Sequence, residues 1–264
     1  MRTSSRADRI LAFDVTETWH PTPRKAVRVA PLPWIPSGDW NATERVCLGL
    51  TSHGTTAFFS SVSLLRLVMT DRAITGPLFE EGPLVHSNRG VVVEAFLARP
   101  DLGEFLLCID VDTIVEATVG RALVTVAKDL ELDVVSQSYP TLSGGCEACL
   151  LNEASPGRVE NVEEPAWGTV VPVDFVGFGC VLLRRRFLVE MQEELRDEGP
   201  DALFAPMPDF PSWGEDYAFC ARARDLGARI ATANVARVRH LKTAPLALRS
   251  QAHLPALQFE PKEA

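Results

Sequence analysis

The stretch LLCIDVDTIV, Leu106 to Val115, decides the fold of this 264-residue chain. Four apolar residues end at Asp110, a second acid follows at Asp112, and apolar residues then resume. A short apolar run of this kind is typical of a strand that is buried on both faces of a parallel sheet. The two acids therefore stand at the carboxyl end of a buried strand, where open α/β sheets collect their ligands.

Two interpretations of this acid pair fit its position. Two hard oxygen donors suit a Mg²⁺ or Mn²⁺ ion that also takes phosphate oxygens from a ligand. Asp110 and Asp112 can share such an ion only if the strand stops and turns between them. Alternatively, the carboxylates cap the turn or helix that follows, and the spacing alone does not choose between the two.

The segments around this strand alternate between strand and helix patterns. Asn88 is expected to cap a helix, and an earlier helix should carry Phe58, Val62, Leu65 and Val68 on one side. This alternation predicts a mostly parallel sheet with helices on both faces. The expected strands cover residues 44–52, 73–80, 103–110 and 132–137, and the expected helices cover residues 58–70, 89–99 and 118–130.

The two ends of the chain are less regular. Residues 1–43 are rich in proline and tryptophan and are expected to form an irregular arm, with a single domain over residues 44–264. The polar stretch 152–168 is interpreted as a loop, either a mobile one or a solvated connection. Beyond it we expect one or two strands in residues 170–184, helices at 185–197 and 214–227, and a strand at 228–238.

The overall charge argues against broad binding of nucleic acid. The formal net charge is −9 and the pI is about 5.1, so a protein of this kind does not neutralise many phosphates. Basic residues nevertheless outnumber acids from Arg222 to Arg249. This cluster is either a set of scattered solvated charges or a patch for a polyanionic acceptor such as DNA.

The sequence carries no export or membrane signal, so a cytoplasmic location is expected. The N-terminus has no apolar run of signal-peptide length, and no run of ~18 apolar residues occurs anywhere. The six cysteines are therefore expected to be mostly reduced. Cys146 and Cys149 form a lone CxxC, which fits a plain loop better than a zinc or redox site because no second pair accompanies it.

Two further groups of polar residues could carry chemistry. Trp213-Gly214-Glu215-Asp216 opens an expected helix, where exposed N–H groups favour ionised carboxylates that can accept a proton. Acids in a first turn are also ordinary in helices. His240 follows the last expected strand, where a neutral imidazole could complete a metal site or simply pack on the surface.

The order of these features resembles that of the GT-A nucleotide-sugar glycosyltransferases, especially small bacterial and phage members of the family 2 type. The resembling motifs are LGLTSHG, HSNRGVVVEAFLARPDLGEFLLCIDVD, FVGFGCVLLRR, WGEDYAFCARARDLG and VRH, which together extend from about Arg45 to Lys242. The resemblance implies an α/β fold of GT-A (Rossmann-like) type, a three-layer sandwich around a mostly parallel central sheet. The chain departs from the family at Thr51-Ser52, where a proline-containing turn is common.

The resemblance also implies roles for individual residues. Asp112 would be the metal ligand that bridges to the donor diphosphate, Asp110 would contact the ribose or the metal, and His240 would be the third ligand of Mn²⁺ or Mg²⁺. Asp216 would be the catalytic base, and its neighbour Glu215 would hold sugar or acceptor hydroxyls. The remaining residues implied to bind the nucleotide-sugar donor, of UDP- or GDP-sugar type, are Thr51, Ser52, His53, Arg89, Gly177, Gly179 and Trp213.

The implied activity is metal-dependent transfer of a sugar to an acceptor hydroxyl, with inversion favoured over retention. The acceptor could be a glycan, a protein or modified phage DNA. A nucleotidyltransferase is an alternative, although HGTTAFFSS is a poor match to the glycine-rich basic loop that grips a triphosphate. A catalytically silent module that binds a nucleotide sugar is the third reading.

Overall fold

The structure is a computed structural model that describes residues 27–28, 45–52, 58–71, 73–141, 147–148, 150–155, 158–199, 201–208 and 213–241. Apart from β1 (Val27–Arg28), the expected N-terminal arm lies outside these residues. His53 and the pair Cys146 and Cys149 lie outside them as well. The division into an arm and one domain therefore stays a prediction.

A mixed sheet of eight strands forms the centre of the described part of the chain. β13 and β11 run opposite to the other six strands, so the sheet is mostly parallel in direction. In spatial order the strands are β1, β11 (Thr169–Pro172), β14 (Ile230–Ala233), β6 (Val134–Gln137), β13 (Cys180–Arg184), β4 (Phe105–Asp110), β2 (Val46–Ser52) and β3 (Ile74–Glu81).

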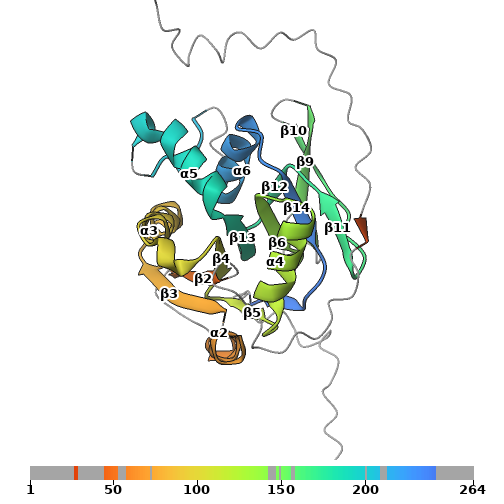
Figure 1. The fold of residues 1–264 in the computed structure, drawn as a ribbon. Helices are drawn as coiled ribbons and strands as arrows, with labels where there is room; N and C mark the ends of the chain where they lie inside the picture. Colours follow the sequence, from red (N-terminus) through yellow and green to blue (C-terminus); the bar gives the residue numbers. More distant parts are fainter. Residues whose placement is uncertain are drawn as a thin grey trace, which may run out of the picture.

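Helices cover both faces of this sheet. Successive side chains of a strand point to opposite faces, so a strand that is apolar throughout needs a covering layer on each face. Leu106 and Cys108 of β4 belong to the core under α3 (Val85–Leu97), α5 (Arg185–Glu194) and α6 (Glu215–Asp225). Leu107 and Ile109 belong to the opposite core, under α2 (Phe58–Thr70) and α4 (Val119–Asp129). Figure 1 shows the resulting three layers, which confirm the expected fold class.

The apolar face expected for α2 is wrong. Val62 and Leu65 are 39% and 59% exposed, whereas Leu64 and Leu67 are buried. Two serines share the buried side: Ser60 Oγ donates to Thr113 O, and Ser63 Oγ accepts from Val115 N. The helix is apolar on several sides, so its hydrophobic period could not reveal that these hydroxyl bonds fix its orientation.

The start expected for α3 is also wrong. The helix begins at Val85, and Asn88 lies inside it as a buried residue rather than as its N-cap. The side-chain amide of Asn88 donates to the carbonyls of Ser52 and Gly82. Asn88 therefore fastens α3 to the carboxyl end of β2, and its helix begins without a side-chain cap.

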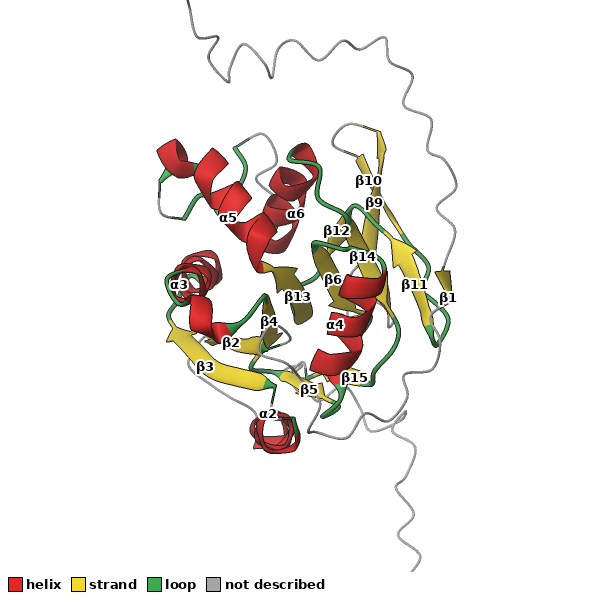
Figure 2. Ribbon diagram, in the orientation of Figure 1, coloured by secondary structure: helices red, strands yellow, loops and turns green. Residues whose placement is uncertain are grey.

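The polar stretch expected to be a loop is largely a hairpin. β9 (Leu150–Ser155) pairs antiparallel with β10 (Arg158–Asn161), and β12 (Phe175–Val176) pairs with β9 on its other side. Figure 2 shows β9 and β10 reaching past the upper end of β11. Arg224 of α6 bonds Glu153 at 2.7 Å and lies 3.6 Å from Asp174, so Glu153 is held in an ion pair, whereas Glu160, Glu163 and Glu164 are exposed.

The strand expected over residues 228–238 is divided between two sheets. β14 joins the central sheet, while β15 (Val238–His240) pairs antiparallel with β5 (Thr113–Val115). A further short pair is formed by β7 (Pro140–Thr141) and β8 (Glu147–Ala148). Single turns of 3₁₀ helix, η2 (Pro100–Leu102) and η3 (Arg196–Glu198), complete the described elements. No described helix combines the length and apolar character that a bilayer crossing needs.

Candidate metal and catalytic site

Asp110 ends β4 at the carboxyl edge of the sheet. The strand pairs with β2 in parallel on one side and with β13 antiparallel on the other, so the position of Asp110 is fixed from both sides. Its backbone N–H donates to Gly179 O at 3.2 Å, and the hydroxyl of Thr51 lies 3.4 Å from its carboxylate. The strand then stops, which is the condition under which Asp110 and Asp112 can face one site.

The β5–β15 pair brings His240 onto this edge. Register pairs His240 with Thr113, and the backbone N–H of Leu241 donates to Asp112 O at 2.7 Å. As a result, His240 Nε2 lies 2.9 Å from Asp112 Oδ1, with the imidazole 8% exposed and the carboxylate 39% exposed. Residues 128 positions apart in the chain thus meet in one cluster.

Asp110, Asp112 and His240 each offer one ligand atom, and these atoms lie within 4.8 Å of one another. Neighbouring ligands of a six-coordinate Mg²⁺ ion lie about 2.9 Å apart, because its metal–oxygen bonds measure about 2.0–2.1 Å. An ionised carboxylate only accepts hydrogen bonds, so the contact between His240 Nε2 and Asp112 holds either a proton or a cation. The donor set therefore fits a hard divalent cation.

Tyr139, just after β6, packs against this cluster. Its ring meets the imidazole of His240 edge-on, with centroids 5.6 Å apart. Its hydroxyl accepts the backbone N–H of Gly179 at 2.9 Å, and Gly179 O in turn accepts the N–H of Asp110. A Cβ at Gly179 would stand 2.7 Å from Tyr139 Cζ, so glycine is required for this packing. Tyr139 therefore connects the histidine to the strand that bears the acid.

Arg89 of α3 joins Asp110 to the first turn of α6. Its guanidinium donates to both carboxylate oxygens of Asp110, at 3.0 and 3.2 Å, and to Glu215 Oε1 at 2.7 Å. The guanidinium also lies over the ring of Phe178, 5.0 Å from its centroid. Burial opposes the charged form, but Asp110, Glu215 and Asp216 outweigh it and raise the pKa of Arg89. Arg89 is thus a permanent cation among three acids.

Asp216 has the properties of a proton acceptor that works near neutral pH. Its side chain folds back over the helix start, where Oδ1 accepts the N–H of Tyr217 at 2.9 Å. Gly214 leaves room for this, because a Cβ there would meet Asp216 Oδ1 at 2.8 Å. Desolvation by burial, opposed by the charge of Arg89 and reinforced by Glu215, raises the pKa of Asp216 to about 6. Such a value suits a general base.

The remaining residues expected to bind the donor lie at or near the same edge. Thr51 and Ser52 end β2, are buried, and adjoin Asp110 and Asn88 respectively. Gly177 lies in the buried turn between β12 and β13, and Trp213 packs edge-on against Phe175 with centroids 5.1 Å apart. Contact of these residues with a donor stays a prediction, as does the role of His53 outside the described residues.

The basic cluster that begins at Arg222 does not form one free patch in the described residues. Arg222 is buried and donates to Ala205 O, Arg224 is paired with acids, and Arg229 lies 3.2 Å from Glu131. Arg237 and Arg239 are exposed, and Lys242 and Arg249 lie outside the described residues. The described part of this cluster therefore offers less free charge to a polyanion than the sequence indicated.

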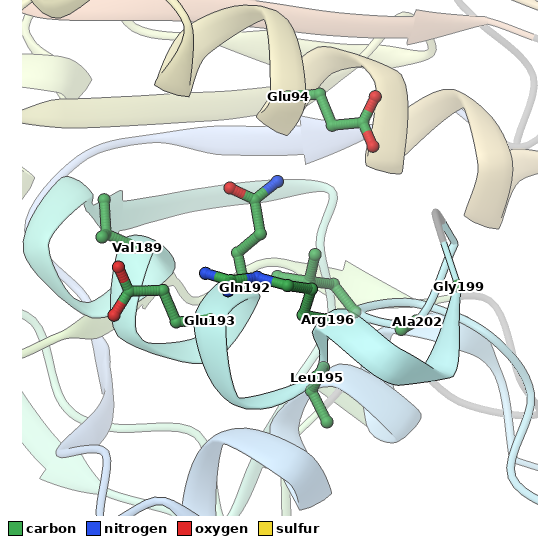
Figure 3. A pocket seen from close by; sticks show the side chains of 9 residues that line it. Glu94, Val189, Gln192, Glu193, Leu195, Arg196, Gly199 and Ala202 are labelled. Carbon is green, nitrogen blue, oxygen red and sulfur yellow. The ribbon is translucent and has the colours of Figure 1, made fainter.

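A surface pocket of about 430 Å³ lies elsewhere, between α3 and the α5–η3 segment. Figure 3 shows Glu94 on one wall and Gln192, Glu193 and Arg196 on the other. It shares no residue with the cluster around Asp110.

The described cysteines are buried, and burial raises the pKa of the Cys47 thiol to about 11, so these thiols are unreactive.

Sequence reasoning missed Tyr139 and Phe178 as parts of the site. Tyr139 follows β6, so the rule that ligands gather beyond the carboxyl ends of strands could have found it. Phe178 carried no such signal, because an aromatic residue in an apolar segment is most often core.

The described fold is similar to solved structures, two of which are named here. A197 from STIV matches with a TM-score of 0.53 and 17% identity, over 75% of this chain and 86% of that one. GalNAc-T7 with UDP, GalNAc and Mn²⁺ matches with a TM-score of 0.52 and 11% identity, over 81% of this chain and 46% of that one. The chain has a GT-A fold. It spans less than half the length of the GalNAc-T7 chain, and identities this low show the fold alone.

The sequence matches no family model and no curated protein. The GT-A fold therefore rests on the three-layer architecture and the two structural similarities.

Proposed function

We propose that the protein is a metal-dependent glycosyltransferase that moves a sugar from a nucleotide-sugar donor to an acceptor hydroxyl, with inversion at the anomeric carbon. The observation that carries the proposal is the convergence of Asp110, Asp112 and His240 at the carboxyl edge of a GT-A sheet. The solved GalNAc-T7 structure holds UDP, GalNAc and Mn²⁺, which makes Mn²⁺ and a UDP-sugar the first ligands to test.

In the proposed site, Asp110, Asp112 and His240 would hold Mn²⁺ or Mg²⁺. When bound, the cation would supply Lewis-acid stabilisation of the charge that grows on the departing diphosphate. His240 is suited to this task because Tyr139 packs on its imidazole and Asp112 lies 2.9 Å from Nε2. A ligand whose orientation is fixed in advance loses little entropy when it binds a cation.

Asp216 would accept the proton of the acceptor hydroxyl as its oxygen attacks the anomeric carbon from the face opposite the leaving group. Its pKa of about 6 leaves it mostly ionised at neutral pH and yet basic enough to take a proton. Glu215 would hold hydroxyls of the sugar or acceptor with the oxygen that Arg89 does not use. The acceptor would be a glycan, a protein or modified DNA, and Arg237 and Arg239 are the members of the basic cluster that are exposed among the described residues.

Two other functions use the same fold. A nucleotidyltransferase would bind a nucleoside triphosphate, and a silent module would bind a nucleotide sugar without turning it over. No observation favours either of these functions over sugar transfer. The raised pKa of Asp216 supplies a proton acceptor, which a catalytically silent binding module does not need.

The test is a panel of UDP- and GDP-sugars, with nucleoside triphosphates beside them, each with Mn²⁺ and with Mn²⁺ removed by chelation. A cognate donor bound only by the folded state raises the melting temperature by mass action. We expect one nucleotide sugar to stabilise the protein in the presence of Mn²⁺ and to be slowly hydrolysed. Asp112→Ala should remove the Mn²⁺-dependent part of both effects.

Three results would contradict the proposal. Stabilisation by triphosphates alone would favour a nucleotidyltransferase, and stabilisation without hydrolysis or transfer to any acceptor would favour a binding module. An unchanged response in Asp112→Ala would remove the proposed cation site.

A further inference from the structure

Arg89 joins three elements at the site: its own helix α3, β4 and α6. It stands on α3, and its side chain is only 5% exposed. It bonds Asp110 of β4 through both carboxylate oxygens and Glu215 of α6 through a second nitrogen. The two acids that it joins keep 25% and 23% of their own side-chain surface exposed.

The geometry leaves Arg89 little surface with which to bind a substrate. Phe178 covers one face of the guanidinium, and the two terminal nitrogens already donate to the two carboxylates. A planar guanidinium with donors in a fixed fork determines the direction as well as the distance of its partners. The side chain therefore acts on its neighbours rather than on a ligand.

Removal of this cation would leave like charges facing one another. Arg89 donates to Asp110 and to Glu215, and Asp216 follows Glu215 in the first turn of α6, so this one cation stands among three carboxylates. Without Arg89, repulsion would drive the first turn of α6 away from the end of β4. The metal-binding acids and the proposed base would then lose their alignment.

We propose that Arg89 is a positioning residue that holds the first turn of α6, with Glu215 and Asp216, in register with the acid at the end of β4. Its catalytic consequence rests on the proposed glycosyltransferase function, whereas the mechanical link between Asp110 and Glu215 does not. Donor binding by Arg89, which the sequence indicated, is thereby replaced by control over the spacing of the donor and acceptor sides.

The test compares Arg89→Met, Arg89→Lys, Glu215→Ala and the double variant Arg89→Met/Glu215→Ala in the full chain. The matched control is Arg121→Met, since Arg121 also pairs with a buried acid, Asp71, 3.3 Å away. Asp71 lies between α2, which ends at Thr70, and β3, which begins at Ile74, so this pair lies at the amino edge of the sheet and away from the site.

We expect Arg89→Met to lower kcat by about 100-fold, as a misplacement of about 1 Å can, while the KM for the donor changes little. Lysine restores the charge without the fork, so Arg89→Lys should recover part of the rate. The double variant should fall no further than the worse single variant, because both changes remove one interaction. Arg121→Met should keep the kcat of the wild type in its folded fraction.

Two results would overturn the inference. Losses in kcat that multiply in the double variant would show that Arg89 and Glu215 act independently. A donor KM that rises while kcat is unchanged would make Arg89 a substrate ligand.

Failure of the proposed function would be recognised separately, as absence of turnover by the wild type with every donor. In that case the wild type, Arg89→Met, Glu215→Ala and the double variant are unfolded in urea. The link predicts that the unfolding equilibrium constants of the two single variants couple by about tenfold in the double variant. If the changes in the free energy of unfolding of the two single variants simply add in the double variant, the link between Arg89 and Glu215 is overturned. If Arg89→Met does not fold, Arg89→Lys and its double variant with Glu215→Ala give the same comparison.

Discussion

The region from β2 to β4 and the region from β6 to β15 are built in different ways. In the first, β2 lies between β3 and β4 and runs parallel to both, and one α-helix stands between successive strands. In the second, successive strands enter different sheets: β9 and β10 form a hairpin, β13 and β14 join the central sheet, and β15 pairs with β5. The first region supplies a rigid floor, and the second brings distant groups onto it.

The site lies where the two regions meet. Asp110 and Arg89 come from the regular region, while Glu215, Asp216 and His240 come from the other. β13 forms the junction, because it pairs antiparallel with β4 on one side and β6 on the other. A change in the regular region, β2 to β4, would disturb the central sheet and lower the stability of the fold. The region from β6 to β15, which we call the composite region, contributes side chains to the site from short separate segments, so a substitution there can change the chemistry of the site and leave the sheet intact.

The largest expected effect tests whether the composite region carries the chemistry. Asp216→Asn removes the proposed base while it keeps the size and the acceptor oxygen of the side chain. We expect turnover to fall by about 10²–10⁴-fold, the usual contribution of a general base. Donor affinity, measured by titration calorimetry with Mn²⁺, should be close to that of the wild type. Donor affinity that falls as steeply as the rate would contradict this role.

The next largest effect tests which face of α2 packs against the sheet of the regular region. Leu67 of α2 is fully buried, so Leu67→Ala should lower the free energy of unfolding by about 2–5 kcal/mol. Leu65 is 59% exposed, so Leu65→Ala on the same helix should change it by no more than about 0.5 kcal/mol. Urea denaturation measures both. Equal losses in the two variants would restore the face of α2 that the sequence predicted.

A smaller effect is expected at the junction of the two regions. In Gly179→Ala the new Cβ meets Tyr139 Cζ at 2.7 Å and its hydroxyl at 2.9 Å, so overpacking should cost about 1–3 kcal/mol. Because Tyr139 packs on His240, Mn²⁺ affinity should fall as well, as measured by electron paramagnetic resonance. Gly120→Ala is the control, since its Cβ meets only side-chain ends, at 3.2 and 3.3 Å. Unchanged Mn²⁺ affinity in Gly179→Ala would disconnect Tyr139 from the cation site.

The smallest effect is a dependence on pH. The pKa of Asp216 rises from 3.8 to about 6 on folding, so between these values the folded protein holds a proton that the unfolded chain has lost. Its stability should therefore fall as pH rises through this window, by about 1–2 kcal/mol once partial exposure is allowed for. Turnover should rise as the pH passes through about 6, where Asp216 of the folded protein becomes ionised. Wild type and Asp216→Asn with parallel stability profiles would contradict the shift.

Strand and helix patterns with strong local signals could be predicted, and those set by distant partners could not. An apolar run predicted β4, and Thr118 followed by a helical period predicted α4. Two acids in a first turn predicted α6. The β9–β10 hairpin was missed because its charges read as solvated, whereas Arg224 neutralises Glu153 from another element. The orientation of α2 was missed because the hydroxyls of Ser60 and Ser63 bond a strand about fifty residues further along the chain.

The sequence by itself determined the chemical types at the site: two acids at the end of a buried strand, two acids in a first helical turn, and a histidine beyond the strand expected at 228–238. These follow from residue identity and local period, which need no knowledge of distant neighbours. Only the tertiary structure decided that Arg89 joins Asp110 to Glu215 and that Tyr139 supports His240. Such contacts depend on strand order and register, which arise when distant segments pair, and no local pattern encodes them.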